Sequence, residues 1–177
     1  ERRTRNQPGN RFDPEPVSVM RLSSLFPAFG VGPETNALVA GISEDSRLIE
    51  PGWLFVAVRG SATDGHFYAE EAVRRGAVAV VAERHVAIPS HVPLVIVPSA
   101  RLALAELAAR FHRHPASHLR LIGFTGTFAK TTTSEILRAL LNAAGRRVGV
   151  LGSLGARYRE FHHPGSGLTT PAPMELH

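Results

Sequence analysis

The chain has 177 residues, 44% of them hydrophobic and 20% charged, and this composition excludes disorder or a fibrous protein for the bulk of the chain. It contains no cysteine, which excludes disulfides, thiolate metal sites and cysteine nucleophiles and favours a reducing compartment, so we expect a cytoplasmic protein. The net charge of +5 comes mostly from scattered arginines and suits an anionic small-molecule substrate as well as it suits nucleic acid.

Residues 1–16 are interpreted as a basic, flexible tail. Basic residues cluster at Arg2–Arg5, and polar residues and proline follow them. This composition favours a solvated tail over an RNA-binding arm, so no nucleic-acid partner is expected. The basic start lacks the apolar core of a signal peptide, and no apolar run approaches the roughly 20 residues that cross a bilayer, so stable membrane insertion is not expected either.

Beyond a short mixed segment at 17–29, strands and helices alternate. Continuous apolar runs predict strands buried on both faces, and helical spacing of apolar residues predicts helices. Gly76 is expected to end the first helix, and Ser99 to cap the start of the second. The predicted order is strand 53–58, helix 67–75, strand 77–81, strand 93–97 and helix 99–112.

The segment 113–118 is polar and broken by Pro115, and it is interpreted as a linker between two α/β domains. With His112 just before it, the segment gathers three histidines at 112, 114 and 118, which raises the hypothesis of a zinc site. No fourth ligand is evident, so the linker interpretation is favoured. After it, a strand is predicted at 119–124, a loop at 125–130, a helix at 131–144 stopped by Gly145, and a strand at 148–151.

The loop before this last helix carries the clearest chemistry. A polyphosphate needs backbone N–H groups turned toward it, a cation for its charge and a hydroxyl for Mg²⁺. Lys130 supplies the cation that stabilises phosphate, Thr131 supplies the metal hydroxyl, and the helix N-terminus supplies the N–H groups. We therefore predict that ATP and Mg²⁺ bind there; the alternative is a strand-to-helix turn whose threonines only cap the helix. The predicted ATP-binding residues are Gly126, Thr127, Phe128, Ala129, Lys130, Thr131 and Thr132.

The loop departs from the general phosphate-loop pattern at two positions. Phe124 and Ala129 stand where that pattern has glycine. Glycine adopts a positive φ at little cost, whereas alanine resists it by on the order of 1 kcal/mol. Altered phosphate binding is therefore expected.

The spacing Thr-Gly-Thr-x-x-Lys-Thr-Thr at 125–132 is similar to that of the Mur ligase family, in which Asn-Gly usually stands at Phe128 and Ala129. Other motifs resemble the N-terminal domain of the MurE branch of that family. These motifs are Asp45-Ser46-Arg47, Pro51-Gly52-Trp53-Leu54-Phe55-Val56-Ala57, Gly60 with Asp64-Gly65-His66, and Gly76-Ala77-Val78-Ala79-Val80-Val81; Thr169-Thr170-Pro171 resembles a substrate loop of the same branch. The resemblance covers residues 37–177.

The resemblance implies an N-terminal α/β domain at 17–112 that binds a UDP-N-acetylmuramoyl peptide, and the start of a phosphate-loop, parallel-sheet domain at 119–177 that binds ATP. It implies an ATP-dependent ligase of peptidoglycan synthesis, which phosphorylates a carboxylate to an acyl phosphate and joins it to the amine of the third amino acid of the stem peptide. The implied substrate-binding residues are Ser46, Ser61, Ala62, Thr63, Thr169 and Thr170, although a turn or cap role is equally open for each of them.

The second domain has room for about two strands before residue 177, so the central domain is expected to be incomplete here. In the family, the Glu that binds Mg²⁺, the modified lysine and the amino-acid-binding domain come later in sequence. This chain alone is therefore not expected to complete ligation. The alternative function is a non-catalytic Mur-like module that binds a nucleotide or UDP-sugar or serves as a scaffold.

Overall fold

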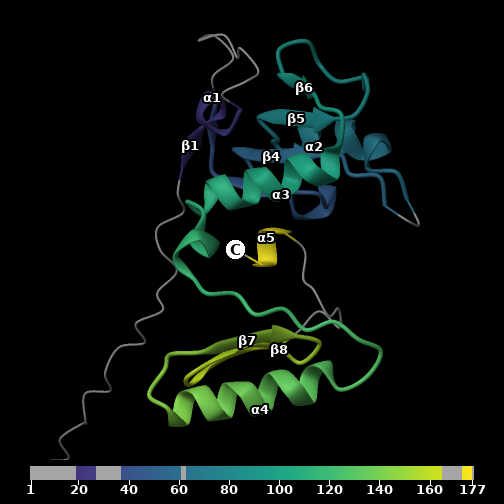
Figure 1. The fold of residues 1–177 in the computed structure, drawn as a ribbon. Helices are drawn as coiled ribbons and strands as arrows, with labels where there is room; N and C mark the ends of the chain where they lie inside the picture. The colour runs from purple at the N-terminus through teal and green to yellow at the C-terminus, as the bar shows by residue number, and fades with distance from the viewer. Residues whose placement is uncertain (1–18, 27–36, 61–62, 165–172, 177) are drawn as a thin grey trace, which may run out of the picture. The chain divides into compact units, whose positions relative to one another are not determined.

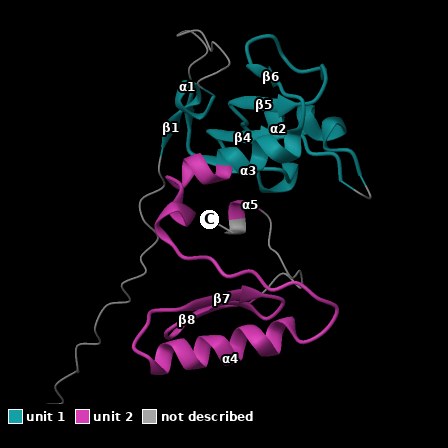
Figure 2. Cartoon of the chain, viewed as in Figure 1, with its two compact units in different colours: residues 1–107 teal, residues 108–177 magenta. Residues whose placement is uncertain are grey.

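The computed structural model describes residues 19–26, 37–60, 63–164 and 173–176, which divide between two compact units, residues 1–107 and 108–177 (Figure 2). The predictions for the tail and for Ser61, Ala62, Thr169 and Thr170 lie outside the described residues. The first unit contains β1 (Met20–Arg21), α1 (Leu22–Leu25), β2 (Leu38–Val39), β3 (Gly41–Ser43), η2 (Ser46–Leu48), β4 (Trp53–Val56), η3 (Gly65–Tyr68), α2 (Ala69–Arg74), β5 (Ala79–Ala82), β6 (Leu94–Ile96) and most of α3 (Ala100–Phe111). The second contains the end of α3, η4 (Pro115–His118), α4 (Lys130–Ala143), β7 (Gly149–Gly152), β8 (Gly155–Tyr158), β9 (Phe161–His163) and α5 (Pro173–Leu176).

The first unit is built on a parallel sheet with the strand order β3-β4-β5-β6 (Figure 1). The register places Phe55 beside Val80, and Val81 beside Val95. All four residues of β5 are buried, which is why this segment is apolar without alternation. The strands predicted at 53–58, 77–81 and 93–97 are thus confirmed, with ends that differ by at most two residues. The strands β1 and β2 form a short antiparallel pair that was not predicted.

Both faces of this sheet are covered. On one face, Phe55 and Val80 pack in an apolar cluster with Ala69 and Ala72 of α2. Alternate residues such as Leu54 point to the opposite face and are also fully buried. Helix α3 buries a stripe of residues at the spacing of one helical face, namely Ala100, Leu104 and Leu107. In the view of Figure 1 this helix is drawn in front of the strands.

Both predicted helix signals in this unit are confirmed. Gly76 has a φ of +107°, and its N–H donates to the carbonyl of Val73 while the N–H of Ala77 donates to the carbonyl of Ala72. This pair of hydrogen bonds closes the end of α2. At the start of α3, the hydroxyl of Ser99 accepts the N–H of Leu102 at 3.3 Å.

The main elements of the second unit are α4 and a three-stranded antiparallel meander, β7-β8-β9, and the described strands of this unit do not form the parallel sheet that was expected. The predicted helix at 131–144 and strand at 148–151 are confirmed to within about a residue. Gly145, with a φ of +75°, ends α4, because its N–H donates to Asn142 and the N–H of Arg146 donates to Leu141.

The strand predicted at 119–124 is wrong, because these residues belong to no strand. Leu121 is 73% exposed and Ile122 is 61% exposed. An apolar run forms a buried strand only where neighbouring strands pair with it, and the described strands of this unit pair with one another through short local turns. The apolar pattern therefore predicted neither the burial nor the backbone structure of this segment, because both depend on partner strands.

Candidate functional site

The carboxyl ends of parallel strands form the usual ligand edge of an open α/β sheet. In the first unit, the described segments that follow the strands are 44–47 after β3, 57–60 and 63–66 after β4, 83–84 after β5, and 97–101, which runs from β6 into α3. We call this set the sheet-edge site. It contains the predicted residues Ser46 and Thr63.

After β3, side chains and backbone lock a tight turn. The N–H of Asp45 donates to the hydroxyl of Ser43 at 3.0 Å, and the carboxylate of Asp45 accepts the N–H of Arg47 at 3.0 Å. The guanidinium of Arg47 also bonds this carboxylate, with Nη2 and Oδ2 2.6 Å apart, and it holds the pKa of Asp45 below its usual value. Asp45 therefore anchors its loop, and Ser46 is buried in the turn that Asp45 caps.

The Asp64-Gly65-His66 motif is explained by three separate constraints. The carboxylate of Asp64 accepts the N–H of His66 at 3.0 Å and so caps η3. A Cβ on Gly65 would lie 2.6 Å from the carbonyl oxygen of Val58, so only glycine fits there without a backbone shift. His66 is 5% exposed, and its Nδ1 lies 2.5 Å from Asp64 Oδ1.

Residues after β5 complete this network. The N–H of Glu83 donates to His66 Nε2 at 3.0 Å, and Arg84 Nη2 donates to Asp64 Oδ2 at 2.8 Å. The hydrogen bond from Arg84, followed by that from the His66 N–H, holds the pKa of Asp64 well below its usual range. Sequence reasoning missed Glu83 and Arg84, although their place directly after a predicted buried strand was a usable signal.

The N-terminus of α3 is already occupied by protein groups. The carboxylate of Glu83 accepts the N–H of Ala100 at 2.8 Å, and Ser99 accepts that of Leu102. An anion at the sheet-edge site is therefore expected to meet arginine side chains rather than this helix end. Four arginines belong to the segments of this site: Arg47, Arg59, Arg84 and Arg101.

The loop after β4 is held at both ends. Arg59 and Asp64 form an isolated antiparallel bridge, and the N–H of Gly60 donates to the carbonyl of Thr63 at 2.9 Å. The side chain of Thr63 is exposed. Arg101 adds a hydrogen bond from Nη2 to the carbonyl of Arg59 at 3.2 Å.

The predicted phosphate loop lies in the second unit and leads into α4. Gly126 has a φ of +149°, and Ala129, the N-cap residue, is in the left-handed region with a φ of +63°. Ala129 has no side chain that could cap the helix, so the N-cap position makes no side-chain hydrogen bond to the first turn. The amides of that first turn are suited to an anion.

Lys130 and Thr131 have protein partners in this structure. Lys130 Nζ donates to the carbonyl of Gly126 at 2.5 Å, which folds the lysine back over its own loop. The hydroxyls of Thr131 and Ser153 lie 3.5 Å apart, which brings the turn after β7 to the start of α4. Ser153 is a second hydroxyl that the sequence did not reveal, because it lies 22 positions away in the chain.

The side chain of Phe128 is 88% exposed, and Thr127 and Thr132 are exposed as well. Behind the loop, Glu135 of α4 forms ion pairs with Arg138 of the same helix and Arg157 of β8. The pair with Arg157 links α4 to the meander. The loop thus presents its polar groups from a supported helix.

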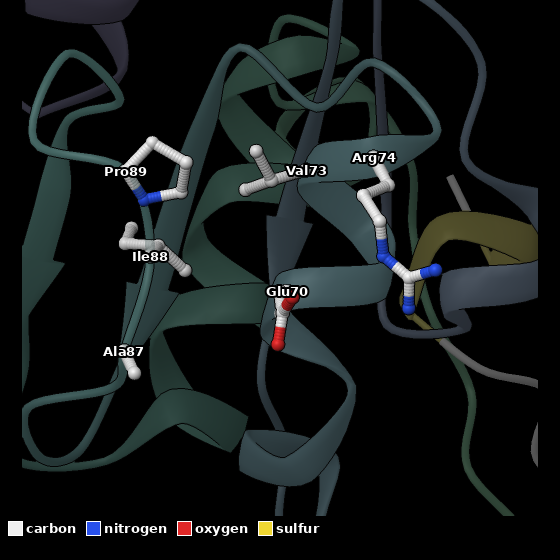
Figure 3. Close-up of a pocket in the computed structure, with 6 residues that line it drawn as sticks. All are labelled: Glu70, Val73, Arg74, Ala87, Ile88 and Pro89. Carbon is white, nitrogen blue, oxygen red and sulfur yellow. The ribbon is translucent and has the colours of Figure 1, made fainter.

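Within the described residues, no group of three or more His, Cys, Asp or Glu side chains lies close enough together to hold a metal ion. Nor is any helix in the described ranges long and apolar enough to cross a membrane. An open hollow of about 370 Å³ lies between α2 and the segment 87–89 (Figure 3). It is lined by Glu70, Val73, Arg74, Ala87, Ile88 and Pro89, none of which is a predicted site residue.

Known proteins with similar sequences match about nine-tenths of the chain and so extend over both units. The family model described as "Mur ligase family, catalytic domain" matches residues 38–112. The UDP-N-acetylmuramoyl-L-alanyl-D-glutamate--2,6-diaminopimelate ligase of Geobacillus thermodenitrificans is 41% identical over 160 residues, which are 90% of this chain and 32% of that protein. The UDP-N-acetylmuramyl-tripeptide synthetase of Deinococcus radiodurans is 41% identical over 165 residues, 89% of this chain and 34% of that protein.

Solved structures share the fold. A MurF structure from Acinetobacter baumannii matches with a TM-score of 0.55 and 28% identity, covering 73% of this chain and 29% of that one. A structure of a UDP-N-acetylmuramoyl-L-alanyl-D-glutamate--2,6-diaminopimelate ligase matches with a TM-score of 0.68 at 24% identity, covering 89% of this chain and 32% of that one, which shows likeness of fold alone. The chain spans about a third of the length of the relatives that it matches.

Proposed function

Because this chain belongs to the Mur ligase family, we propose that it is the substrate-binding domain and the start of the ATP-binding domain of a MurE-type ligase. The proposed reaction adds diaminopimelate, the third residue of the stem peptide, to UDP-N-acetylmuramoyl-L-alanyl-D-glutamate in peptidoglycan synthesis. In it, ATP converts a carboxylate of the UDP-linked dipeptide to an acyl phosphate, and the amine of diaminopimelate displaces the phosphate.

The observation that carries this proposal is the 41% identity to a diaminopimelate ligase over 90% of the chain. The proposed domains are 17–112 for the UDP-linked substrate, 113–118 as a linker, and 119–177 as the beginning of the phosphate-loop domain, whose described strands form an antiparallel meander. Since the chain spans about a third of such a ligase, turnover is proposed for a protein of the relatives' length, acting in the cytoplasm.

In this proposal the uridine nucleotide binds at the sheet-edge site. Ser46 and the loop 61–63 contact the uridine, and Thr169 and Thr170 contact the substrate near its diphosphate or sugar. The arginines of the site support this placement, because a diphosphate carries charge that Arg84 and Arg59 can balance. Arg84 uses one of its N–H groups on Asp64, and a guanidinium has four more to donate.

ATP is proposed to bind at residues 126–132, with its phosphates at the start of α4. Lys130 would exchange the carbonyl of Gly126 for phosphate oxygens, and the first-turn amides would face the same charge. Thr131, with Ser153 beside it, would supply hydroxyl oxygen to Mg²⁺, which would balance phosphate charge there.

One observation favours a second candidate, a non-catalytic module that binds a UDP-sugar or serves as a scaffold. Ala129 holds a left-handed backbone conformation that costs alanine about 1 kcal/mol, and Phe128 projects beside it into solvent. A loop with these residues can retain its shape while binding ATP weakly.

Calorimetric titration of the chain with UDP-N-acetylmuramoyl-L-alanyl-D-glutamate and, separately, with MgATP tests the proposal. Both ligands are expected to bind. Lys130→Ala is expected to weaken only the binding of MgATP, by at least about tenfold, and Arg84→Ala is expected to weaken only the binding of the UDP-linked ligand. Binding of the UDP-linked ligand without any MgATP binding favours the non-catalytic module. Binding of neither ligand contradicts both candidates.

A further inference from the structure

The buried imidazole of His66 connects three segments of the sheet-edge site. Its Nδ1 contacts the carboxylate of Asp64, and its Nε2 accepts the N–H of Glu83. Asp64 in turn bonds Arg84, and Glu83 bonds the first amide of α3 at Ala100. The loop after β4, the segment after β5 and the start of α3 are therefore joined through one side chain.

These contacts fix the protonation of the ring. A backbone N–H can only donate, so the Nε2 atom that meets the Glu83 N–H is an acceptor and carries no hydrogen. The hydrogen is then on Nδ1, which donates it to Asp64. Only the neutral, Nδ1-protonated imidazole makes both contacts at once.

We propose that His66 is a positioning residue for the uridine-nucleotide site, an inference that rests on the proposed function of the sheet edge. By holding the Glu83 amide, it fixes the backbone that carries Arg84. By holding Asp64, it fixes the carboxylate that orients the Arg84 guanidinium. The half-exposed Arg84 then presents its remaining donors to the nucleotide's diphosphate.

Substitution of His66 by glutamine or by asparagine tests its contacts with Glu83 and with Asp64 separately. The amide of glutamine reaches the position of Nε2, so His66→Gln keeps an acceptor for the Glu83 N–H. The amide of asparagine reaches only the position of Nδ1, so His66→Asn keeps a donor for Asp64 and leaves the Glu83 N–H without its acceptor. His66→Leu removes both contacts at similar volume, and His91→Gln is the matched control, because His91 is an exposed histidine of the same unit.

The experiment is calorimetric titration of each variant with UDP-N-acetylmuramoyl-L-alanyl-D-glutamate, well below its melting temperature. His66→Leu and His66→Asn are expected to raise Kd about tenfold or more, equivalent to 1.4 kcal/mol or more. The Kd of His66→Gln is expected to stay within about threefold of the wild-type value, and the Kd of His91→Gln is expected to match it. Hydrogen exchange of the Glu83 amide in the ligand-free chain is expected to stay slow in wild type and His66→Gln and to accelerate in His66→Asn.

A purely structural role for His66 lowers the melting temperature of the variants and leaves Kd of the folded protein unchanged. That result, or equal loss of affinity in His66→Gln and His66→Asn, overturns the inference while the proposed function stands. Absence of binding by wild type overturns both. If His66→Leu does not fold, the comparison of glutamine with asparagine decides.

Discussion

Replacing Gly65 by alanine is expected to destabilise the first unit more than any surface substitution. An added Cβ would lie 2.6 Å from the carbonyl oxygen and 2.9 Å from the nitrogen of Val58, and 3.1 Å from the carbonyl carbon of Ala57. All three atoms are backbone atoms next to β4, so they cannot rotate away as the end of a side chain could. The strand or the start of η3 must therefore move.

The magnitude has two parts. Forcing a methyl group into a packed site costs about 1–3 kcal/mol. The same movement lengthens the hydrogen bond from the Gly65 N–H to Val58, now 3.0 Å, and its loss costs about 1 kcal/mol. The sum of roughly 2–4 kcal/mol corresponds to a fall in melting temperature of about 10 °C or more for a unit of this size.

Thermal unfolding followed by far-UV circular dichroism measures this change. Gly123→Ala is the matched control, because a Cβ there meets nothing within 4 Å, and it is expected to leave the transition of the first unit unchanged. The packing argument predicts a melting temperature about 10 °C or more below that of wild type, so a Gly65→Ala protein that melts within about 1 °C of wild type would refute it.

The remaining predictions concern the phosphate loop and the acid dependence of the first unit. Ala129→Gly relieves a left-handed alanine that the ligand-free loop already contains, so it is expected to stabilise the second unit by up to about 1 kcal/mol in thermal unfolding; a lower melting temperature contradicts it. Lys130→Ala is expected to lose at least about tenfold in MgATP affinity, with unchanged binding of the UDP-linked ligand as the internal control. Since the folded pKa of Asp64 is depressed, its stabilising contribution is present above its unfolded pKa of about 4 and is lost as the pH falls below that value. Asp64→Asn is therefore expected to flatten the dependence of melting temperature on pH below about 5, and an unchanged slope would show that other carboxylates dominate.

The sequence was sufficient for the elements whose signals are local. Continuous apolar residues at 53–58 and 77–81 predict buried strands because parallel strands are covered on both faces, and β4 and β5 form there. Gly76 and Gly145 mark helix ends because each adopts a positive φ. The phosphate loop was found for the same reason, since its residues are consecutive.

What depends on distant partners could not be predicted. The segment 119–124 has the composition of a strand, yet a strand needs a paired neighbour, and local composition does not say whether one is present. The network at His66 joins positions 17 to 20 residues apart, through Glu83 and Arg84, so no single window of sequence contains it. The ion pairs of Asp45 and Asp64 with arginine likewise emerged only from the fold.

The most direct measurement of the central proposal is phosphate release by a protein of the relatives' length that contains this chain. With MgATP and UDP-N-acetylmuramoyl-L-alanyl-D-glutamate present, release is expected to require diaminopimelate and to stop when Lys130 is replaced by alanine. A protein that binds the UDP-linked dipeptide but releases no phosphate when diaminopimelate is added would contradict the ligase and favour the non-catalytic module.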